Sequence, residues 1–343
     1  MNEASAAVLE LAASIAGAGA RGVSCRRNPG CAHLHLDLRP LRELRFYQPA
    51  DLTVGVDAGM SPAELNAILA PQRQWVPLDV ANPGRTTLGA VLACHRSGPL
   101  RQRFGTVRDF VIGMEMATAV GELVHAGGRV VKNVAGYDWG KVMIGSRGAL
   151  GIMTGVNFRV YPRPEGGLTA GFGPLEWEQV EALRHGLLHS PLRPLAIELW
   201  RPAGQAAMVV VRCAGSAGVR ARCRHELEAL AGVGKCAVEF PPDELGDLLG
   251  AAATGSAEAV WQRIQAFPQD GDRQVAMPPA EAVRRLGELD PGVAISGRLG
   301  LGVYWIRGAA PGEAPNPGVA GLMARLKREL DPEGRLHGDD CVR

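Results

Sequence analysis

The chain has 343 residues, of which 46% are apolar and 21% charged, and a net charge of +2 at neutral pH. This length exceeds one ordinary core and predicts two domains, and the composition is that of a globular protein. So small a net charge gives no reason to expect binding to nucleic acid or to an acidic membrane surface. No apolar run reaches about 18 residues, so the sequence predicts no transmembrane segment.

The N-terminus and the cysteines bear on the cellular compartment. The apolar stretch that opens the chain contains Glu3 and Glu10 and lacks the basic start of a signal peptide. The seven cysteines are an odd number and form no CxxC pair, which predicts free thiols rather than a disulfide framework. Because the ligand spacings of zinc and iron–sulfur sites are also missing, we expect no metal in this chain. The sequence therefore predicts a cytoplasmic protein.

The first 75 residues alternate between helical and strand patterns. The spacing predicts a helix over Ser5–Ala16 whose buried stripe consists of Val8, Leu9, Ala12 and Ile15. Alternating apolar residues predict strands at His33–Leu38 and Asp51–Asp57. Ser61 and Glu64 then form a capping box, which predicts a helix that buries Leu65, Ile68 and Leu69.

Glycine and proline punctuate the stretch Asn82–Pro162, as expected where a backbone must turn and pass close to a ligand. Thr86 and Thr87 are N-cap candidates for a short helix that buries Leu88, Val91 and Leu92. Unpaired N–H groups at the start of such a helix suit a phosphate or an electron-rich ring. An ordinary capped core helix is the alternative interpretation.

Two strands, a helix and a third strand follow. Phe110–Ala119 and Glu122–Ala126 are predicted to form a hairpin in which Gly121 supplies the positive φ of the turn. A helix is predicted at Trp139–Ile144. Beyond a glycine-rich loop, alternating residues from Ile152 to Val160 predict a half-buried strand.

In the second half, strands and helices alternate beyond residues 162–167, which have the composition of a linker. This order predicts an α+β domain. The predicted strands are Leu195–Trp200, Ala206–Cys213, Lys235–Phe240, Val260–Phe267 and Gly300–Ile306, and the predicted helices are Val219–Leu230 and Ala280–Leu289. The Pro- and Gly-rich block at Gly308–Gly318 is predicted to be a mobile loop.

Four spaced motifs, GRTTLGAVLACHRSGP, FGTVRDFVIG, VVKNVAGYD and GSRGALGIMT, resemble the flavin-binding domain of the vanillyl-alcohol-oxidase and p-cresol-methylhydroxylase (PCMH) type. VRDFVIG and KNVAGYD narrow the resemblance to the FAD-binding GlcE-type subunit family of bacterial glycolate oxidases. The resemblance extends back to about Ile15 and returns at Leu326–Gly334. It implies an α+β fold with a two-lobed PCMH-type FAD-binding domain at 1–163 (lobes at about 15–75 and 76–163), a smaller α+β cap at 168–330 and a return segment at 331–343.

The resemblance also implies non-covalent FAD, because neither the first loop nor the cap offers His, Cys or Tyr at a matching position. In the family a glycine-rich loop after a strand wraps the pyrophosphate, and the matching residues are Gly17, Gly19 and Arg21. A helix C-cap followed by a loop is the alternative for that segment. The ribityl chain and ring are expected near Gly84, Arg85, Thr86, Thr87, Leu88, Gly89, Cys94, His95 and Gly98, and the backbone of Gly148, Gly151 and Ile152 is expected to meet the flavin.

Oxidation of a 2-hydroxy acid needs a hydride acceptor, a base for the hydroxyl proton and a cation for the carboxylate. Arg85, Lys132 and Arg263 are candidate cations, with a solvated or ion-paired residue as the alternative for each. His337 is a candidate base or flavin contact, and the alternative is a surface histidine on the C-terminal tail. The cap lacks the metal-binding histidines of relatives that oxidise 2-hydroxy acids alone.

The resemblance thus implies an FAD-dependent oxidoreductase subunit of a glycolate-oxidase-like complex, with glycolate or a similar small 2-hydroxy acid as substrate. Its implied partners are a larger flavin subunit and an iron–sulfur subunit, through which any association with a membrane would arise. The alternative is a flavin fold that serves as an assembly and interaction module with weak or no FAD binding. A free-standing flavin oxidoreductase is a third interpretation. A Rossmann dehydrogenase is disfavoured, since no strand–GxGxxG–helix unit occurs.

Overall fold

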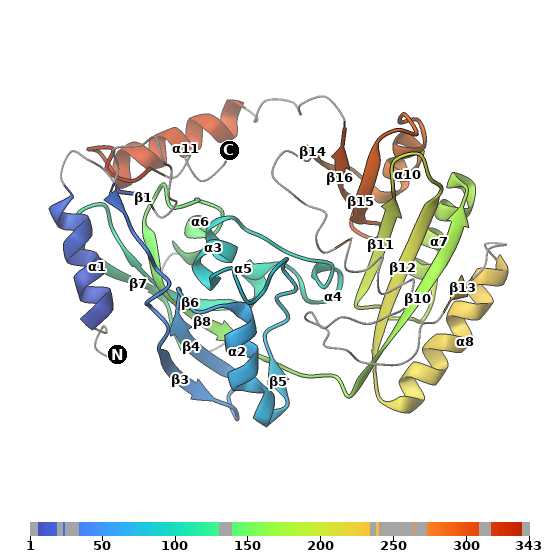
Figure 1. Cartoon of the computed structure of the whole chain (residues 1–343), viewed down its shortest axis with the longest axis horizontal. Coiled ribbons are helices and arrows are strands. Elements are labelled where there is room, and N and C mark those ends of the chain that lie inside the picture. Colours follow the sequence, from blue (N-terminus) through green and yellow to red (C-terminus); the bar gives the residue numbers. More distant parts are fainter. Residues whose placement is uncertain are drawn as a thin grey trace. The chain divides into compact units, whose positions relative to one another are not determined.

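The computed structural model describes residues 6–18, 23–24, 34–129, 139–233, 238–239, 264, 273–308 and 317–337. It divides into two compact units (Figure 1). Unit 1 consists of residues 1–97, 106–163 and 314–343, and unit 2 of residues 98–105 and 164–313. The chain therefore leaves unit 1 after Arg163 and returns to it at Ala314. The sequence-based boundaries differ here, because they assigned residues up to 330 to the second domain.

A five-stranded antiparallel sheet forms the centre of unit 1, in the order β3-β4-β8-β6-β7. Its strands are β3 (Leu44–Gln48), β4 (Thr53–Asp57), β6 (Val111–Ala117), β7 (Leu123–Gly127) and β8 (Ile152–Arg159). The sheet combines strands from both predicted lobes, since β4 pairs with β8. The expected division between residues 75 and 76 therefore does not separate two sheets. Val54, Val56, Val156 and Phe158 of the two central strands are all buried, which explains why they pair there.

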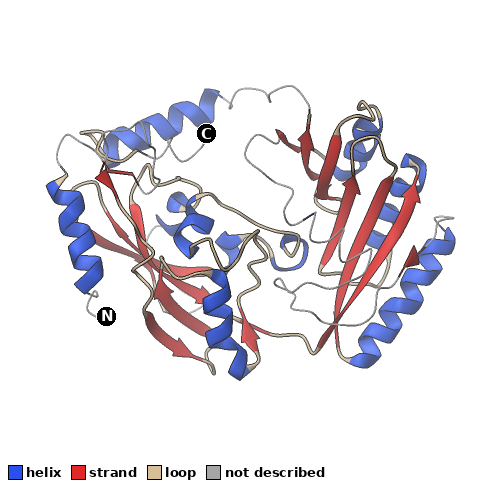
Figure 2. Cartoon of the chain, viewed as in Figure 1, coloured by secondary structure: helices blue, strands red, loops and turns tan. Residues whose placement is uncertain are grey.

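Short strands and helices complete unit 1. The strands are β1 (Val23–Ser24), parallel to β2 (Leu34–His35), and β5 (Gln74–Trp75), antiparallel to β9 (Tyr161–Pro162). The helices are α1 (Ala6–Gly17), α2 (Pro62–Leu69) with a 3₁₀ turn at Ala70–Gln72, α3 (Leu88–Ala93), α5 (Val107–Phe110), α6 (Trp139–Met143) and α11 (Pro317–Leu330). Figure 2 shows helices and strands in both units, and the strand pairs of both large sheets are antiparallel, which confirms the α+β prediction.

Local capping chemistry explains where several helices begin. The Ser61 hydroxyl accepts a hydrogen bond from the Glu64 N–H, and the Glu64 carboxylate accepts one from the Ser61 N–H, which confirms the predicted capping box. Thr87 caps α3 through its side chain, as predicted. The hairpin between β6 and β7 is also confirmed, with φ of +83° at Gly121. Because a capping bond spans only three residues, it is readable from sequence.

Burial differs from the sequence prediction at two places in unit 1. On α1, Leu9 is 54% exposed, and Leu11 takes its place in the buried stripe with Val8, Ala12 and Ile15. On β8, Met153 is buried as deeply as its neighbours, so the strand is covered on both faces over its first half rather than half-buried. Helices α3 and α6 pack against this sheet. They supply cover that an isolated alternating pattern does not reveal.

Unit 2 contains a seven-stranded sheet in the order β13-β10-β12-β11-β15-β16-β14. Its strands are β10 (Gly166–Leu175), β11 (Ala196–Arg201), β12 (Ala207–Gly215), β13 (Val238–Glu239), β14 (Arg273–Ala276), β15 (Ala294–Arg298) and β16 (Val303–Arg307). Helices α7 (Trp177–His189), α8 (Ala217–Val233) and α10 (Pro279–Gly287) form the main core with one face of this sheet, and α4 (Arg101–Phe104) also belongs to the unit (Figure 2).

Strands β10, β14 and β15 and helix α7 of unit 2 were not predicted, and β10 and α7 are the longest of them. Strand β10 begins at Gly166, inside the segment whose composition suggested a linker. A Cβ at Gly166 would lie 2.0 Å from Nη1 of Arg220, so the glycine makes room for a guanidinium rather than marking a flexible connection. The predicted strand at Val260–Phe267 is wrong at Ile264, which is helical, and its other residues lie outside the described ones. Most of the predicted mobile loop also lies outside them.

Candidate functional site

The turn before α3 is held tightly against the connection between β4 and α2. The N–H of Leu88 donates to the Met60 carbonyl at 2.8 Å, and the N–H of Gly89 donates to the Ala58 carbonyl at 2.7 Å. A Cβ at Gly89 would lie 3.2 Å from that same carbonyl oxygen, so glycine permits the close approach.

These contacts correct one sequence-based expectation. The N–H of Ala90 donates to the Thr87 hydroxyl at 3.1 Å. Together with the bonds of Leu88 and Gly89, it leaves the first turn of α3 largely satisfied within the protein. The start of this helix is therefore not the open set of N–H donors that the Gly-Thr-rich turn suggested.

Residues Gly145–Gly151, named here the glycine loop, are joined to the far end of α3. The N–H of Gly145 donates to the Leu92 carbonyl at 3.1 Å, and the N–H of Arg147 donates to the Ala93 carbonyl at 2.9 Å. Cys94 and His95, which follow α3, thereby lie beside the loop, and a Cβ at Gly145 would be 3.5 Å from that of His95. The structure thus brings together two of the segments that the sequence assigned to the flavin.

Arg108 is bonded to Ile144, the residue directly before the glycine loop. Its Nη2 donates to the Ile144 carbonyl at 2.9 Å, and a Cβ at Gly145 would lie 3.9 Å from the same nitrogen. Arg108 belongs to the VRDFVIG motif, but the sequence analysis did not select it as a site residue. The motif could have pointed to Arg108, but nothing in the sequence shows that Arg108 contacts Ile144, a residue 36 positions away.

The loop conformation keeps open backbone at its centre. Gly145, Arg147 and Gly148 have φ values of +91°, +57° and +84°. A Cβ at Gly148 would meet only the tip of Ile152, at 3.8 Å. Glycine is therefore required at Gly148 by the backbone and not by crowding, which leaves room for another group to approach.

Ser146 carries a buried hydroxyl inside this loop. The residue is 4% exposed, and within the described part of the chain its Oγ has no hydrogen-bond partner. A buried hydroxyl without a partner costs free energy, and a bound polar ligand is one way to satisfy it. Sequence reasoning missed Ser146, because the burial of its hydroxyl depends on surrounding elements that the motif does not contain.

The C-terminal segment reaches the same loop. Lys327 Nζ donates to the Ala149 carbonyl at 2.8 Å and to the Leu336 carbonyl at 2.5 Å, and it pairs with Asp331. His337 directly follows Leu336 and is partly buried. The candidate base therefore lies on the segment that is tied to the glycine loop.

The other residues predicted to contact the flavin differ in burial, and some lie in unit 2 or outside the described residues. The side chains of Leu88 and Ile152 are buried in the core, and a Cβ at Gly151 would press on Met143 at 2.9 Å. Contact of these three residues with the flavin stays a prediction. Gly84 is open and Arg85 is exposed. Gly98 belongs to unit 2. Four predicted residues lie outside the described ones: Gly19, Arg21, Lys132 and Arg263.

Gly17, the first of the residues predicted at the pyrophosphate, is the last residue of α1. This position agrees with the alternative interpretation of the segment, the end of a helix followed by a loop. Gly19 and Arg21 lie outside the described residues, so the pyrophosphate contact stays a prediction.

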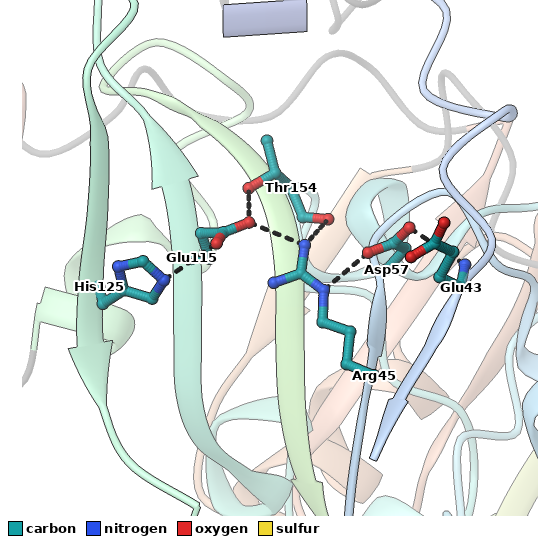
Figure 3. A network of polar contacts seen from close by, with 6 residues as sticks. All are labelled: Glu43, Arg45, Asp57, Glu115, His125 and Thr154. Carbon is teal, nitrogen blue, oxygen red and sulfur yellow. Dashed lines mark hydrogen bonds and ion pairs between the residues drawn. The ribbon is translucent and has the colours of Figure 1, made fainter. Parts of the chain in front are cut away.

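A buried ion network crosses the sheet of unit 1 (Figure 3). Arg45 donates to Asp57 through Nε and to Glu115 through Nη2, both at 2.7 Å. Glu115 also accepts a hydrogen bond from Thr154 at 2.7 Å and pairs with His125 at 2.9 Å. Burial alone would raise the pKa of Glu115, but the hydrogen bonds from Arg45 and Thr154 outweigh it and the pKa lies below its ordinary value.

In the part of the chain that the structure describes, no group of three or more His, Cys, Asp and Glu side chains is arranged to hold a metal ion. Cys94, Cys213 and Cys223 are free thiols. No helix among the described residues combines the length and apolar character needed to cross a membrane.

Comparison with known proteins assigns the N-terminal region. Residues 6–127 match the FAD binding domain family. Glycolate oxidase subunit GlcE of Escherichia coli (strain K12) is 38% identical over 135 residues, which cover 39% of each chain. The mitochondrial D-lactate dehydrogenase (cytochrome) of Arabidopsis thaliana is 33% identical over 135 residues, which cover 39% of this chain and 24% of that protein. The chain thus aligns with less than half the length of these relatives.

A solved structure extends the likeness of fold over almost the whole chain. Alkyldihydroxyacetonephosphate synthase matches with a TM-score of 0.69 at 16% identity, covering 96% of this chain and 73% of that one. At this identity the match establishes the fold alone.

The residues described above fit a flavin. The buried Ser146 hydroxyl needs a polar partner, and the open backbone at Gly148 and Gly84 leaves space for a group to approach. The match over residues 6–127 covers the α3 turn, and the glycine loop is bonded directly to α3. The match of residues 6–127 to the FAD binding domain family and the identity with glycolate oxidase subunit GlcE support FAD as the cofactor of this chain.

Proposed function

We propose that this chain is the FAD-binding subunit of a glycolate-oxidase-like 2-hydroxy-acid dehydrogenase complex. The observation that carries the proposal is the 38% identity with glycolate oxidase subunit GlcE over 135 residues. D-lactate and D-2-hydroxyglutarate dehydrogenases among the relatives support the same substrate class. Glycolate or a similar small 2-hydroxy acid is the proposed electron donor.

Bound FAD would supply the acceptor for a hydride, which carries both electrons of the oxidation. The chain's own residues hold it: Ser146 offers a hydrogen bond, while Gly84 and Gly148 permit close approach. Arg85, exposed in the turn before α3, is the described candidate for binding a carboxylate, and Lys132 and Arg263 stay proposals from sequence. His337 is proposed as the base, because the segment that carries it is bonded to the glycine loop through Lys327.

The proposed partners are a larger flavin subunit and an iron–sulfur subunit. Support comes from the relative, which is named a subunit of glycolate oxidase. A cytoplasmic location, with any membrane contact made through those partners, belongs to the same proposal. The proposal also includes a division into domains, in which unit 1 contains the two lobes of the FAD-binding domain and unit 2 is the cap.

An absorption spectrum of the purified chain, followed by denaturation, tests the proposal first. We expect the two visible flavin bands and release of about one FAD per chain. Co-expression with the two partner subunits should then give glycolate-dependent reduction of a dye, and Arg85→Met should raise the KM for glycolate. A colourless chain that FAD does not reconstitute would contradict the proposal and favour the assembly-module alternative. Turnover of glycolate by the purified chain alone would favour a free-standing enzyme.

A further inference from the structure

We propose that Lys327 is a positioning residue for the cofactor, which holds the glycine loop in the conformation that receives FAD. This inference rests on the proposed function, in which FAD binds at the glycine loop. It starts from one contact between residues 178 positions apart, in which Lys327 Nζ donates to the Ala149 carbonyl at 2.8 Å.

The ammonium group of Lys327 is fully used by its surroundings. A lysine has three N–H donors, and Lys327 directs them at three acceptors in unit 1. These acceptors are the carbonyls of Ala149 and Leu336 and the carboxylate of Asp331. One side chain thereby joins the glycine loop, helix α11 and the segment that follows the helix.

Asp331 keeps the lysine in place independently of the loop. Its carboxylate is fully buried and accepts backbone hydrogen bonds from Arg335 at 2.8 Å and Leu336 at 2.7 Å. Burial would raise the pKa of Asp331, but Lys327 and these two N–H groups outweigh it and the pKa is lowered. Because the carboxylate stays ionised, Lys327 is oriented before any ligand arrives.

The glycine loop needs such support in its second half. Its first half is bonded to α3, and Arg108 is bonded to Ile144 just before it. Its centre contains Arg147 at φ +57°, a left-handed conformation that a residue other than glycine adopts only under constraint. Ala149 follows two residues later, and Lys327 holds its carbonyl. The contact therefore fixes the loop just beyond Ser146 and Gly148, the two residues that we place at the flavin.

Leu336 attaches the same segment to the end of the loop. It is 2% exposed and shares an apolar cluster with Ile152, the residue that follows Gly151. The C-terminal segment is thus bonded to the loop at Ala149 and shares an apolar cluster with the first residue of β8, directly after the loop. Lys327 and Leu336 together make loop geometry depend on the last described residues of the chain.

The competing explanation is that Lys327 only stabilises the end of α11. A lysine in the last turn interacts favourably with the helix dipole and pairs with an acid four residues on. In that case its removal would loosen α11 but would leave the loop unchanged. Amide hydrogen exchange over residues 145–152 and the FAD dissociation rate separate the two roles.

The test compares Lys327→Met with a matched control, Arg328→Met, which removes an exposed charge from the same helix. Each protein is purified with FAD, and flavin release is followed by fluorescence. Loop exchange is measured on the FAD-free form. In Lys327→Met both the exchange and the release should accelerate by about tenfold or more, as expected for loss of a charged hydrogen bond. Arg328→Met should match the wild type.

Two further variants keep the outcome clear. Lys327→Met/Asp331→Asn removes both charges, so no unpaired carboxylate remains buried, and it replaces the single variant if that one does not fold. Lys327→Arg should show a smaller effect, because a planar guanidinium keeps a donor for the carbonyl but does not reproduce three diverging bonds. Circular dichroism verifies the fold of each protein.

If the wild type binds FAD and folded Lys327→Met shows unchanged loop exchange and unchanged FAD release, the role of Lys327 is overturned. The proposed function is then unaffected. A wild-type chain that takes up no FAD would overturn the proposed function, and this inference with it.

Discussion

Arg45 and Glu115 are joined by a 2.7 Å ion pair that reaches across two intervening strands of the sheet in unit 1. Arg45 lies on the edge strand β3, and Glu115 lies on β6, with β4 and β8 between them. The guanidinium passes over Gly155 of β8, where a Cβ would lie 2.1 Å from Nη1. A glycine at this position of the sheet is thus what allows the pair to form.

Replacing Glu115 should destabilise unit 1. In Glu115→Gln, the largely buried Arg45 loses one of its two charged partners and keeps Asp57. Losing a hydrogen bond between charged groups should cost about 2 kcal/mol. Chemical denaturation of the FAD-free protein measures the loss. The control is Glu122→Gln, an exposed residue of the neighbouring hairpin, which should change the free energy of unfolding by less than about 0.5 kcal/mol. Equal stability of the two variants would refute a stabilising role for the network.

Gly155→Ala should destabilise the protein by displacing Arg45, at a cost of about 2 kcal/mol. The cause would be lost ion pairs, since a flexible side chain can move away from the new methyl group. A double-mutant cycle with Arg45→Met identifies this cause, because the alanine should cost much less when the guanidinium is absent. Gly321→Ala on α11, where a Cβ meets no atom within 4 Å, is the control and should lose no stability. Additive effects in the cycle would contradict the explanation.

The contribution of Glu115 should disappear in acid. Its folded-state pKa is lowered from the ordinary value of 4.5, so the ionised form stabilises the fold at and above that pH. The stability difference between wild type and Glu115→Gln should stay constant from pH 7 down to the ordinary pKa. Below it, the difference should shrink as the pH falls through the lowered pKa. Denaturation series at several pH values provide the measurement, and a difference that shrinks on raising the pH would have the wrong sign.

Ser146→Ala should separate stability from cofactor binding. Removing a buried hydroxyl that has no partner in the described structure should leave the FAD-free protein as stable as wild type, or more stable by about 1 kcal/mol. The FAD dissociation constant should rise about tenfold, because the bound cofactor loses a hydrogen bond.

Thermal melts and a fluorescence titration measure the two effects of Ser146→Ala. Ser296→Ala, at a second buried and unpartnered hydroxyl in the described part of unit 2, should preserve FAD affinity. A loss of stability without a loss of affinity in Ser146→Ala would assign its hydroxyl a structural role.

Features set by neighbouring residues were predictable from sequence, and features set by distant residues were not. The capping box at Ser61 and the N-cap at Thr87 each depend on a bond across three residues. The glycine loop was found through its motif. Its tether to Lys327 was not, because the two residues lie 178 positions apart and neither one signals the other.

The structural role of individual glycines was difficult to predict from the sequence. At Gly166 it was interpreted as part of a linker, yet it lies in β10 beside Arg220. At Gly155 and Gly89 it accommodates a guanidinium and a carbonyl. In each case the neighbour that requires glycine comes from another element. Composition alone therefore cannot distinguish a flexible glycine from a packed one.

The interruption of unit 1 by unit 2 sets an order for synthesis on the ribosome. Residues 1–163 emerge first, but α11 and Leu336 emerge only after all of unit 2. The nascent flavin unit must therefore wait for about half of the chain to be translated before its last helix can dock. A chain that ends at residue 313 should show a glycine loop more sensitive to proteolysis than the full chain, and equal protection would show that the unit matures without its final helix.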